Sequence, residues 1–96
     1  MADAVMLTVF CYDISRASVR RRVSAVLEAE GVRVQESVFE ARLPRRTARR
    51  VAREAAALLE DGDSLRIYAI GADGLRRCET FGWGPPVLDG AAYALL

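Results

Sequence analysis

One acidic side chain, Asp13, lies near the end of an otherwise apolar run, Val-Met-Leu-Thr-Val-Phe-Cys-Tyr-Asp-Ile at residues 5–14. Such a uniformly apolar run is typical of a strand that is buried on both faces. A carboxylate at the end of a buried strand needs a cation, a hydrogen-bond network or a proton. One hypothesis is that Asp13 holds a divalent metal ion next to nucleic acid. This hypothesis would give Asp13 a catalytic role and makes it the leading candidate for a catalytic residue.

The chain contains no histidine. Ser-His-Asp triads, Cys-His pairs, imidazole acid–base catalysis and histidine-ligated zinc are therefore excluded within the chain, and carboxylates and arginines must carry any chemistry. Its two cysteines, Cys11 and Cys78, have no second thiolate or histidine near them in the sequence. We predict that both are reduced thiols rather than parts of a zinc site or a disulfide.

The positive charges are unevenly distributed along the chain. All 14 are arginines, because lysine is absent. Eleven of them lie between Arg16 and Arg53, against four acidic residues, which gives this segment a net charge of +7 in a chain whose overall charge is +1. Codon bias in a GC-rich genome accounts for arginine in place of lysine, but not for the clustering. The clustering indicates a surface that faces the phosphates of a nucleic acid.

A helix is predicted after the first strand, capped by Ser15 or Ser18, running to about residue 30 and stopped by Gly31. Arg20 and Arg22 fall on either side of its apolar stripe at helical spacing, while Arg21 points away from the core. Arginines at such a rim often lie along apolar surface and expose their charged ends, but these two could also reach the sheet end that carries Asp13.

Residues 32–43 alternate well enough for extended structure, with a kink or bulge near residues 35–37 and a turn that the sequence does not place. A second helix of about 16 residues is expected from Pro44. Its outer face carries four arginines: Arg46, Arg49, Arg50 and Arg53. This stripe is either a solvated helix face or, with Arg16, Arg20 and Arg22, a contact surface for a DNA or RNA backbone.

Residues 64–70 are predicted to form a strand, 71–74 a turn and 76–81 a short strand, with regular structure broken at 82–86. The apolar tail within residues 82–96 is expected to pair with a sheet edge of its own chain or of a partner. We expect one domain over residues 1–96, in a soluble cytoplasmic protein without a membrane partner.

This order of elements predicts a ferredoxin-like α+β fold, βαββαβ, with one or two short extra C-terminal strands. Both crossover helices of such a unit lie on one face of the sheet. The first strand is nevertheless apolar on both faces, with Val5, Leu7, Val9 and Cys11 on one and Met6, Phe10 and Tyr12 on the other. We expect an identical sheet to cover the second set across a two-fold axis, and hence a homodimer.

Three sequence blocks resemble the CRISPR-associated Cas-two family: Tyr12-Asp13-Ile14, Gly31-Val-Arg33-Val-Gln35-Glu-Ser37-Val-Phe39-Glu and Asp63-Ser-Leu-Arg66-Ile-Tyr68, together with Arg20 and Arg22. The resemblance covers residues 5 to about 70. It implies a ferredoxin-like homodimer that works with the Cas-one integrase in acquiring new CRISPR spacers. It also implies a metal-dependent endonuclease acting on single-stranded RNA or double-stranded DNA.

The resemblance also implies the site residues. Asp13 is expected to hold the metal, with Tyr12, Arg20, Arg22, Arg33 and Phe39 in the active cleft. Mg²⁺ or another divalent cation would be shared between the Asp13 side chains of two protomers, because one carboxylate is a poor site for this ion. Ser15-Arg16 stands where relatives often carry an acid. Two alternatives remain open: a non-catalytic DNA-binding scaffold of the integrase complex, in which Asp13 pairs with Arg16 or Arg20, and a toxin-like ribonuclease of the same fold.

Overall fold

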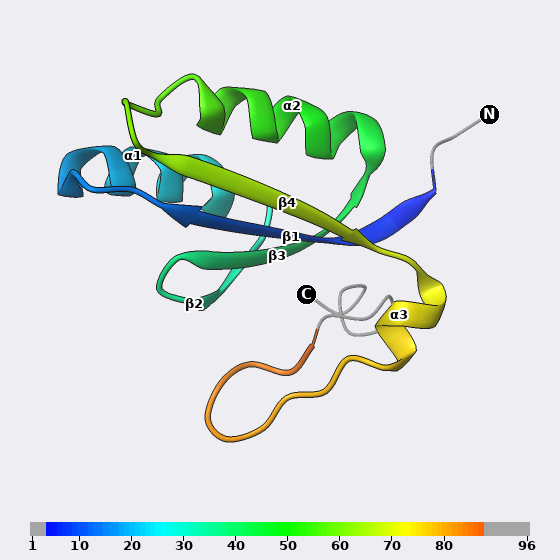
Figure 1. Cartoon of the computed structure of the whole chain (residues 1–96). Coiled ribbons are helices and arrows are strands. Elements are labelled where there is room, and N and C mark those ends of the chain that lie inside the picture. The colour runs from blue at the N-terminus through cyan, green and yellow to red at the C-terminus, as the bar shows by residue number, and fades with distance from the viewer. Residues whose placement is uncertain (1–3, 88–96) are drawn as a thin grey trace.

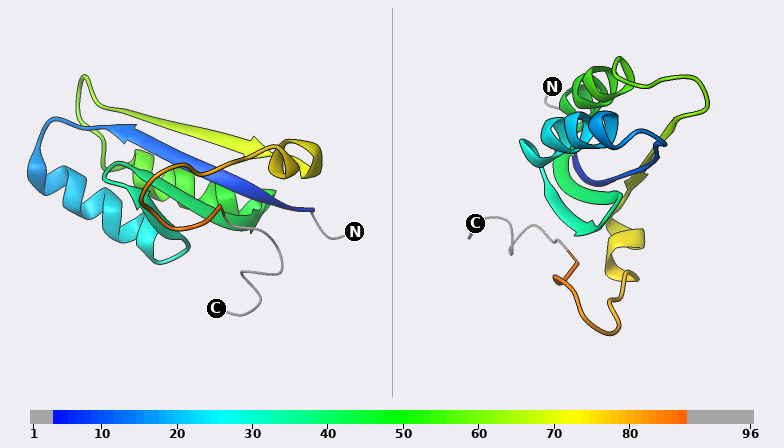
Figure 2. Two further views of the ribbon diagram at one scale, coloured as in Figure 1. Left: turned by 90° about the horizontal axis from the view of Figure 1, so that it is seen from below. Right: turned by 90° about the vertical axis from the view of Figure 1, so that its left-hand side faces the viewer.

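The computed structural model describes residues 4–87 of the chain, and its elements follow the predicted order. They are β1 (Val5–Asp13), α1 (Ala17–Glu28), β2 (Val32–Gln35), β3 (Val38–Pro44), α2 (Arg45–Ala56), β4 (Ser64–Ile70) and α3 (Ala72–Arg76). The strands form one antiparallel sheet in the order β2-β3-β1-β4. Helices α1 and α2 lie together on one face of it, as two views show (Figure 1, Figure 2). This confirms the ferredoxin-like α+β prediction.

The core lies between this face of the sheet and the two helices. Phe10 of β1 pairs with Phe39 of β3 on one side and with Ile67 of β4 on the other, so the three side chains share a face. Phe10 and Phe39 are fully buried there. The helices contribute the apolar residues that recur at helical spacing, namely Val19, Val23 and Leu27 from α1 and Ala48, Val51 and Ala55 from α2.

The prediction of which side of β1 faces away from the helices was wrong. Phe10 and Tyr12 belong to the helix-covered core, and Met6 shares their parity. The side of β1 that faces away from the helices therefore carries Val5, Leu7, Val9, Cys11 and Asp13. We call this side of the sheet the open face. Because β1 is apolar at both parities, its sequence contains no signal that distinguishes the two sides.

The predicted irregularity within residues 32–43 is confirmed. A register shift lies between Arg33 and Gln35, and the turn that joins β2 to β3 occupies residues 36 and 37. Gly31, which precedes β2, is required by close packing: a Cβ atom there would lie 2.6 Å from the main-chain oxygen of Glu40. The hairpin can therefore approach the end of α1 only because residue 31 has no side chain.

Two helix boundaries differ from the predictions. Neither serine caps α1, since Arg16 is the N-cap residue and the Ser15 amide donates instead to Oδ1 of Asp63 at 3.2 Å. Helix α2 begins at Arg45 and ends at Ala56, about three residues early. The amides of Leu58 and Leu59 donate to oxygens only three residues back, so the chain tightens into a turn there.

The C-terminal part of the structure contradicts the predicted turn at 71–74 and the predicted strand at 76–81. Residues 72–76 form the short helix α3, in which Asp73 pairs with Arg76 at 3.1 Å and Arg77 at 3.5 Å. These pairs favour a helical turn where the two glycines had indicated a loop. Residues 78–87 are irregular, as predicted for 82–86. The rest of the predicted apolar tail, residues 88–96, lies outside the described residues. None of the helices within residues 4–87 is long and apolar enough to cross a lipid bilayer.

Candidate active site

A hollow of about 270 Å³ lies where β1 ends, between the start of α1 and the β2–β3 hairpin. It is lined by Tyr12, Asp13, Ile14, Arg20, Arg33, Glu36 and Ser37. The structure thus brings together four of the predicted site residues, which come from three separate segments of the sequence. Arg22 is exposed on α1 and does not line this hollow, and Phe39 lies beneath it in the core.

Asp13 is one of two exposed acidic residues that line the hollow, and Glu36 is the other. It pairs with Ser64 of β4 in the sheet register and belongs to the open face. Within residues 4–87, no hydrogen bond or ion pair holds its side chain. Arg20 donates from Nη1 to the carbonyl oxygens of Ile14 at 2.9 Å and Ser15 at 2.8 Å. Arg16 pairs with Glu60, with 3.3 Å between its Nε and the Oε1 of Glu60. A structural ion pair of Asp13 with Arg16 or Arg20 is therefore not formed.

Tyr12 connects three elements around the hollow through its hydroxyl group. Its side chain is only 8% exposed, and its hydroxyl group donates to the main-chain oxygen of Glu36 at 3.2 Å. Since the hydroxyl has a single proton, the 2.9 Å bond to Ser24 is one that Ser24 donates. Tyr12 thus ties β1 to α1 and to the hairpin, which makes it a positioning residue.

Arg33 lies across the ring of Phe39, with its guanidinium carbon 4.7 Å from the ring centroid. The guanidinium donates to the Glu36 main-chain oxygen from Nη1 and to Oε1 of Glu28 from Nη2, the latter at 3.1 Å. The bond to Glu28 raises the pKa of Arg33 above its usual value, so this guanidinium stays charged near neutral pH. Phe39 is 0% exposed and supports Arg33 from below through a cation–π contact.

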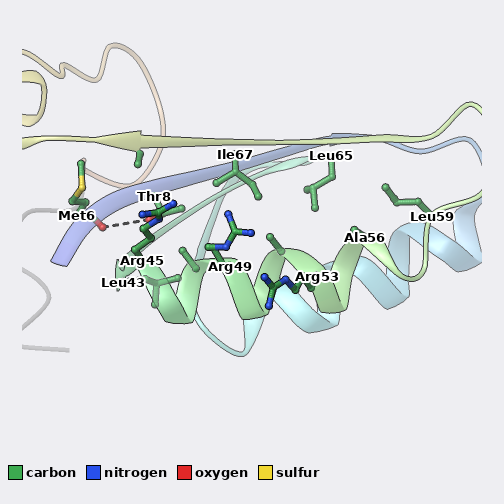
Figure 3. A pocket seen from close by; sticks show the side chains of 13 residues that line it. Met6, Thr8, Leu43, Arg45, Arg49, Arg53, Ala56, Leu59, Leu65 and Ile67 are labelled. Atoms are coloured by element: carbon green, nitrogen blue, oxygen red, sulfur yellow. Dashed lines mark hydrogen bonds between the residues drawn. The ribbon is translucent and has the colours of Figure 1, made fainter. Parts of the chain in front are cut away.

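The predicted arginine stripe of α2 is exposed, but its members face different surroundings. Arg49 and Arg53 line a second hollow beside β4, together with Arg45 (Figure 3). Arg50 faces acidic groups, with Nη1 at 3.1 Å from Glu54 and Nη2 at 3.7 Å from Glu30. Arg46 is exposed at the start of the helix. The stripe is therefore not one uniform basic face.

One chain does not supply a complete metal site. Within the part of the chain that the structure describes, no group of three or more Asp, Glu or Cys residues is placed to hold an ion. Asp63 is next to Ser64, the sheet partner of Asp13, but it accepts the amides of Ser15 at 3.2 Å and Glu60 at 2.9 Å and so fixes two loops. A single carboxylate does not meet the coordination that Mg²⁺ prefers, so such a site needs ligands from outside the chain.

Two participants were missed in the sequence. The main-chain oxygen of Glu36 accepts bonds from both Tyr12 and Arg33, and Ser24 donates to Tyr12 from the buried side of α1. Glu36 lies within the block of residues 31–40 that carries the resemblance, but its role depends on a main-chain carbonyl group, which every residue has and no sequence pattern marks. Ser24 is a polar residue beside Val23 on the buried side of α1. A hydroxyl group at such a position needs a hydrogen-bond partner, and this is the feature from which its role could have been predicted.

The chain is similar in sequence to known proteins. Residues 6–78 match the family model described as CRISPR associated protein Cas2. The chain is 39% identical over 83 residues to a protein of Chloroflexus aurantiacus named CRISPR-associated endoribonuclease Cas2 1. The matched region covers 84% of this chain and 89% of that relative.

It is also similar in fold to solved structures. A hypothetical protein from Thermus thermophilus is 37% identical, with a TM-score of 0.76 over 85% of this chain and 96% of that one. A chain of a partial Cas6-RT-Cas1–Cas2 complex, 22% identical, shares the fold, with a TM-score of 0.64 over 88% of this chain and 92% of its own length. On the family model and the identity to a curated relative, the chain belongs to the Cas2 family of CRISPR-associated proteins.

Proposed function

We propose that this protein takes part in acquiring new CRISPR spacers, as a homodimer that associates with the Cas1 integrase and hydrolyses phosphodiester bonds of RNA or DNA with a divalent metal ion. Family membership, the endoribonuclease name of the Chloroflexus relative and the Cas1–Cas2 complex among the similar structures support the role. The observation that carries the nuclease activity is the Asp13 carboxylate, exposed and unpaired within residues 4–87, in a hollow that Arg20 and Arg33 also line.

The homodimer is supported by the open face. Val5 is 49% exposed there, and Val9 and Cys11 are half-buried on the same side as Asp13. A second copy packed on this face would cover the apolar residues and bring two Asp13 carboxylates toward each other. At a separation of about 5 Å their repulsion is on the order of 3 kcal/mol at an effective dielectric constant of 20. A divalent cation shared between them, such as Mg²⁺, would relieve it.

The residues of the hollow define the remaining roles. When bound, the metal ion would neutralise a phosphate oxygen and lower the pKa of a coordinated water molecule. Arg20 uses only Nη1 for its two bonds to carbonyl oxygens, which leaves its other donors for a phosphate. Arg33 keeps its positive charge and is held in place by Glu28 and Phe39. Both guanidinium groups would stabilise the charge that develops on the phosphate.

Metal dependence tests the proposal directly. End-labelled single-stranded RNA and double-stranded DNA, incubated with the purified chain and Mg²⁺, are expected to be cleaved. Excess chelator should stop the cleavage, and added Mg²⁺ should restore it, because the proposed mechanism depends on the ion to activate the attacking water molecule. Calorimetric titration should give about one ion per two chains, as a site shared across a two-fold axis requires. Cleavage that persists in chelator would contradict the proposed mechanism.

A scaffold role is the second candidate, favoured by the exposed arginines of α1 and α2. In it, the dimer holds integrase copies apart and grips the backbone of the DNA to be inserted. Both roles can belong to one protein, because most of the exposed arginines of α1 and α2 lie outside the hollow and only Arg20 is common to the two surfaces.

The salt dependence of binding tests contact with the nucleic-acid backbone. If about five phosphates are neutralised per complex, the logarithm of the association constant should fall with the logarithm of salt concentration at a slope of about −4.5. Anisotropy of a labelled DNA duplex over a series of NaCl concentrations measures it. A flat dependence would leave composition bias as the account of the arginine cluster.

A further inference from the structure

A larger hollow of about 510 Å³ lies on the other side of the sheet from Asp13, between α2 and the edge strand β4 (Figure 3). We call it the α2–β4 groove. Its walls are aliphatic, with Leu65, Ile67 and Ala69 from β4 and Leu43, Ala52 and Leu59 among the residues opposite. Ile67 is 42% exposed, although it is in register with the fully buried Phe10. The sheet face is therefore covered incompletely at β4.

Three arginines of α2 border the groove: Arg45, Arg49 and Arg53. They are spaced four residues apart, so they form one row along the helix, about 6 Å from one to the next. The close-up view shows them on the side of α2 that faces β4 (Figure 3). Within residues 4–87 no ion pair neutralises any of the three, unlike Arg50 on the neighbouring side of the helix, which pairs with Glu54.

These features favour a protein ligand over a nucleic acid. The groove has no aromatic side chain among the residues that line it, so it offers no platform for stacking a base. The polar edges of a base would also be buried against aliphatic side chains without hydrogen-bond partners. Aliphatic side chains fit the walls, and carboxylates beside them match the row of arginines.

We propose that the α2–β4 groove binds an amphipathic helix of another protein. The aliphatic stripe of that helix would pack on β4, and its own acidic residues, spaced three or four apart, would face the arginines of α2. Such a helix would lie beside α2 as a third helix on this face of the sheet, and its carboxylates would repeat at the spacing of the arginines. The groove is on the face opposite the open face, so the same chain can dimerise there and bind the helix here.

The probe is a fluorescein-labelled peptide of roughly 16 residues, about four helical turns, with leucines on one face and glutamates beside them. Added to the full-length ¹⁵N-labelled protein, it should shift the amide signals of β4 and of the facing side of α2. A peptide with lysine in place of glutamate should bind at least about tenfold more weakly, because the arginines would then repel it.

Variants make the test specific. Ile67→Glu should weaken binding of the acidic peptide by about tenfold or more, since it places a carboxylate in the apolar wall; Ala69→Glu, also at an exposed position, is the second variant if Ile67→Glu does not fold. The double variant Arg49→Glu, Arg53→Glu should weaken it similarly. Arg21→Glu, an exposed charge reversal on α1 outside the groove, should leave it unchanged.

Several outcomes would overturn the proposal. Equal binding of the lysine peptide would remove the role of the arginines, and amide shifts on the open face or α1 would place the peptide elsewhere. A single-stranded oligonucleotide that displaces the peptide and is itself weakened by Ile67→Glu would make the groove a nucleic-acid site. No binding at millimolar peptide, with β4 amides already protected from hydrogen exchange in the free protein, would show that another part of the protein itself fills the groove.

Discussion

Replacing Asp13 by asparagine is expected to abolish metal-dependent cleavage, with a loss of about a thousandfold or more, and to leave the chain folded. Asparagine keeps the shape of the side chain but removes the negative charge that would hold the ion. The loss corresponds to about 4 kcal/mol of transition-state stabilisation, within the range that removal of one electrostatic contact can produce. Folding should be unaffected because, within residues 4–87, Asp13 is exposed and makes no hydrogen bond or ion pair. Initial rates of cleavage and circular dichroism measure the two effects.

Asp61→Asn is the matched control, because it removes the same charge from an exposed turn outside the hollow. It should cleave like the parent protein. Undiminished cleavage by the Asp13 variant would contradict the assignment of the metal ligand. Spacer integration by a reconstituted complex carrying Asp13→Asn distinguishes the two proposed roles: integration that persists without cleavage would show that the scaffold role does not need the nuclease.

Replacing Phe39 by alanine is expected to lower the free energy of unfolding by about 3–5 kcal/mol, because it removes a fully buried ring and leaves a cavity. Phe39 packs against Tyr12, with ring centroids 6.4 Å apart, and lies directly below Arg33. The substitution therefore also removes the support of one arginine of the hollow. Urea unfolding at a fixed protein concentration measures the loss, since any dimer makes stability depend on concentration.

Phe39→Leu separates packing from catalysis. Leucine fills most of the cavity, so its cost in stability should be clearly smaller than that of alanine. Cleavage by the leucine variant should fall only modestly, because Phe39 does not line the hollow and Glu28 still holds Arg33. A leucine variant that is as stable as the parent but inactive would show that the ring itself contacts substrate, contrary to its burial.

The sequence predicted those elements whose apolar spacing is regular. β4 matches its predicted range, and β1, α1 and α2 match theirs apart from their ends. The sides of β1 could not be assigned, because both are apolar and only packing against α1 and α2 decides which becomes the core. Helix α3 was missed because Gly71 and Gly74 indicate a turn, whereas the pairing of Asp73 with two arginines acts only once the helical turn forms.

The candidate site was predictable in its charged members and not in its supports. Asp13 stood out as the one charge in an apolar strand, Arg20 came from helical spacing and from motif resemblance, and Arg33 came from motif resemblance. The same motif included Phe39, but a motif does not distinguish a residue that lines a hollow from one that lies under it. Arg22 followed from helical spacing and from the same resemblance, and neither of them gives the reach of the side chain.

The main-chain oxygen of Glu36 accepts hydrogen bonds from two sides, from the Tyr12 hydroxyl group and from the Arg33 guanidinium. A carbonyl oxygen has two lone pairs, so this one is fully used in the free protein. An anion that draws Arg33 toward itself would leave Tyr12 as the oxygen's remaining partner and loosen the hairpin tip. An anion bound in the hollow would therefore make the tip of the β2–β3 hairpin less rigid. When the hydrogen bond from Arg33 to Glu36 forms again, it would favour release of the bound substrate.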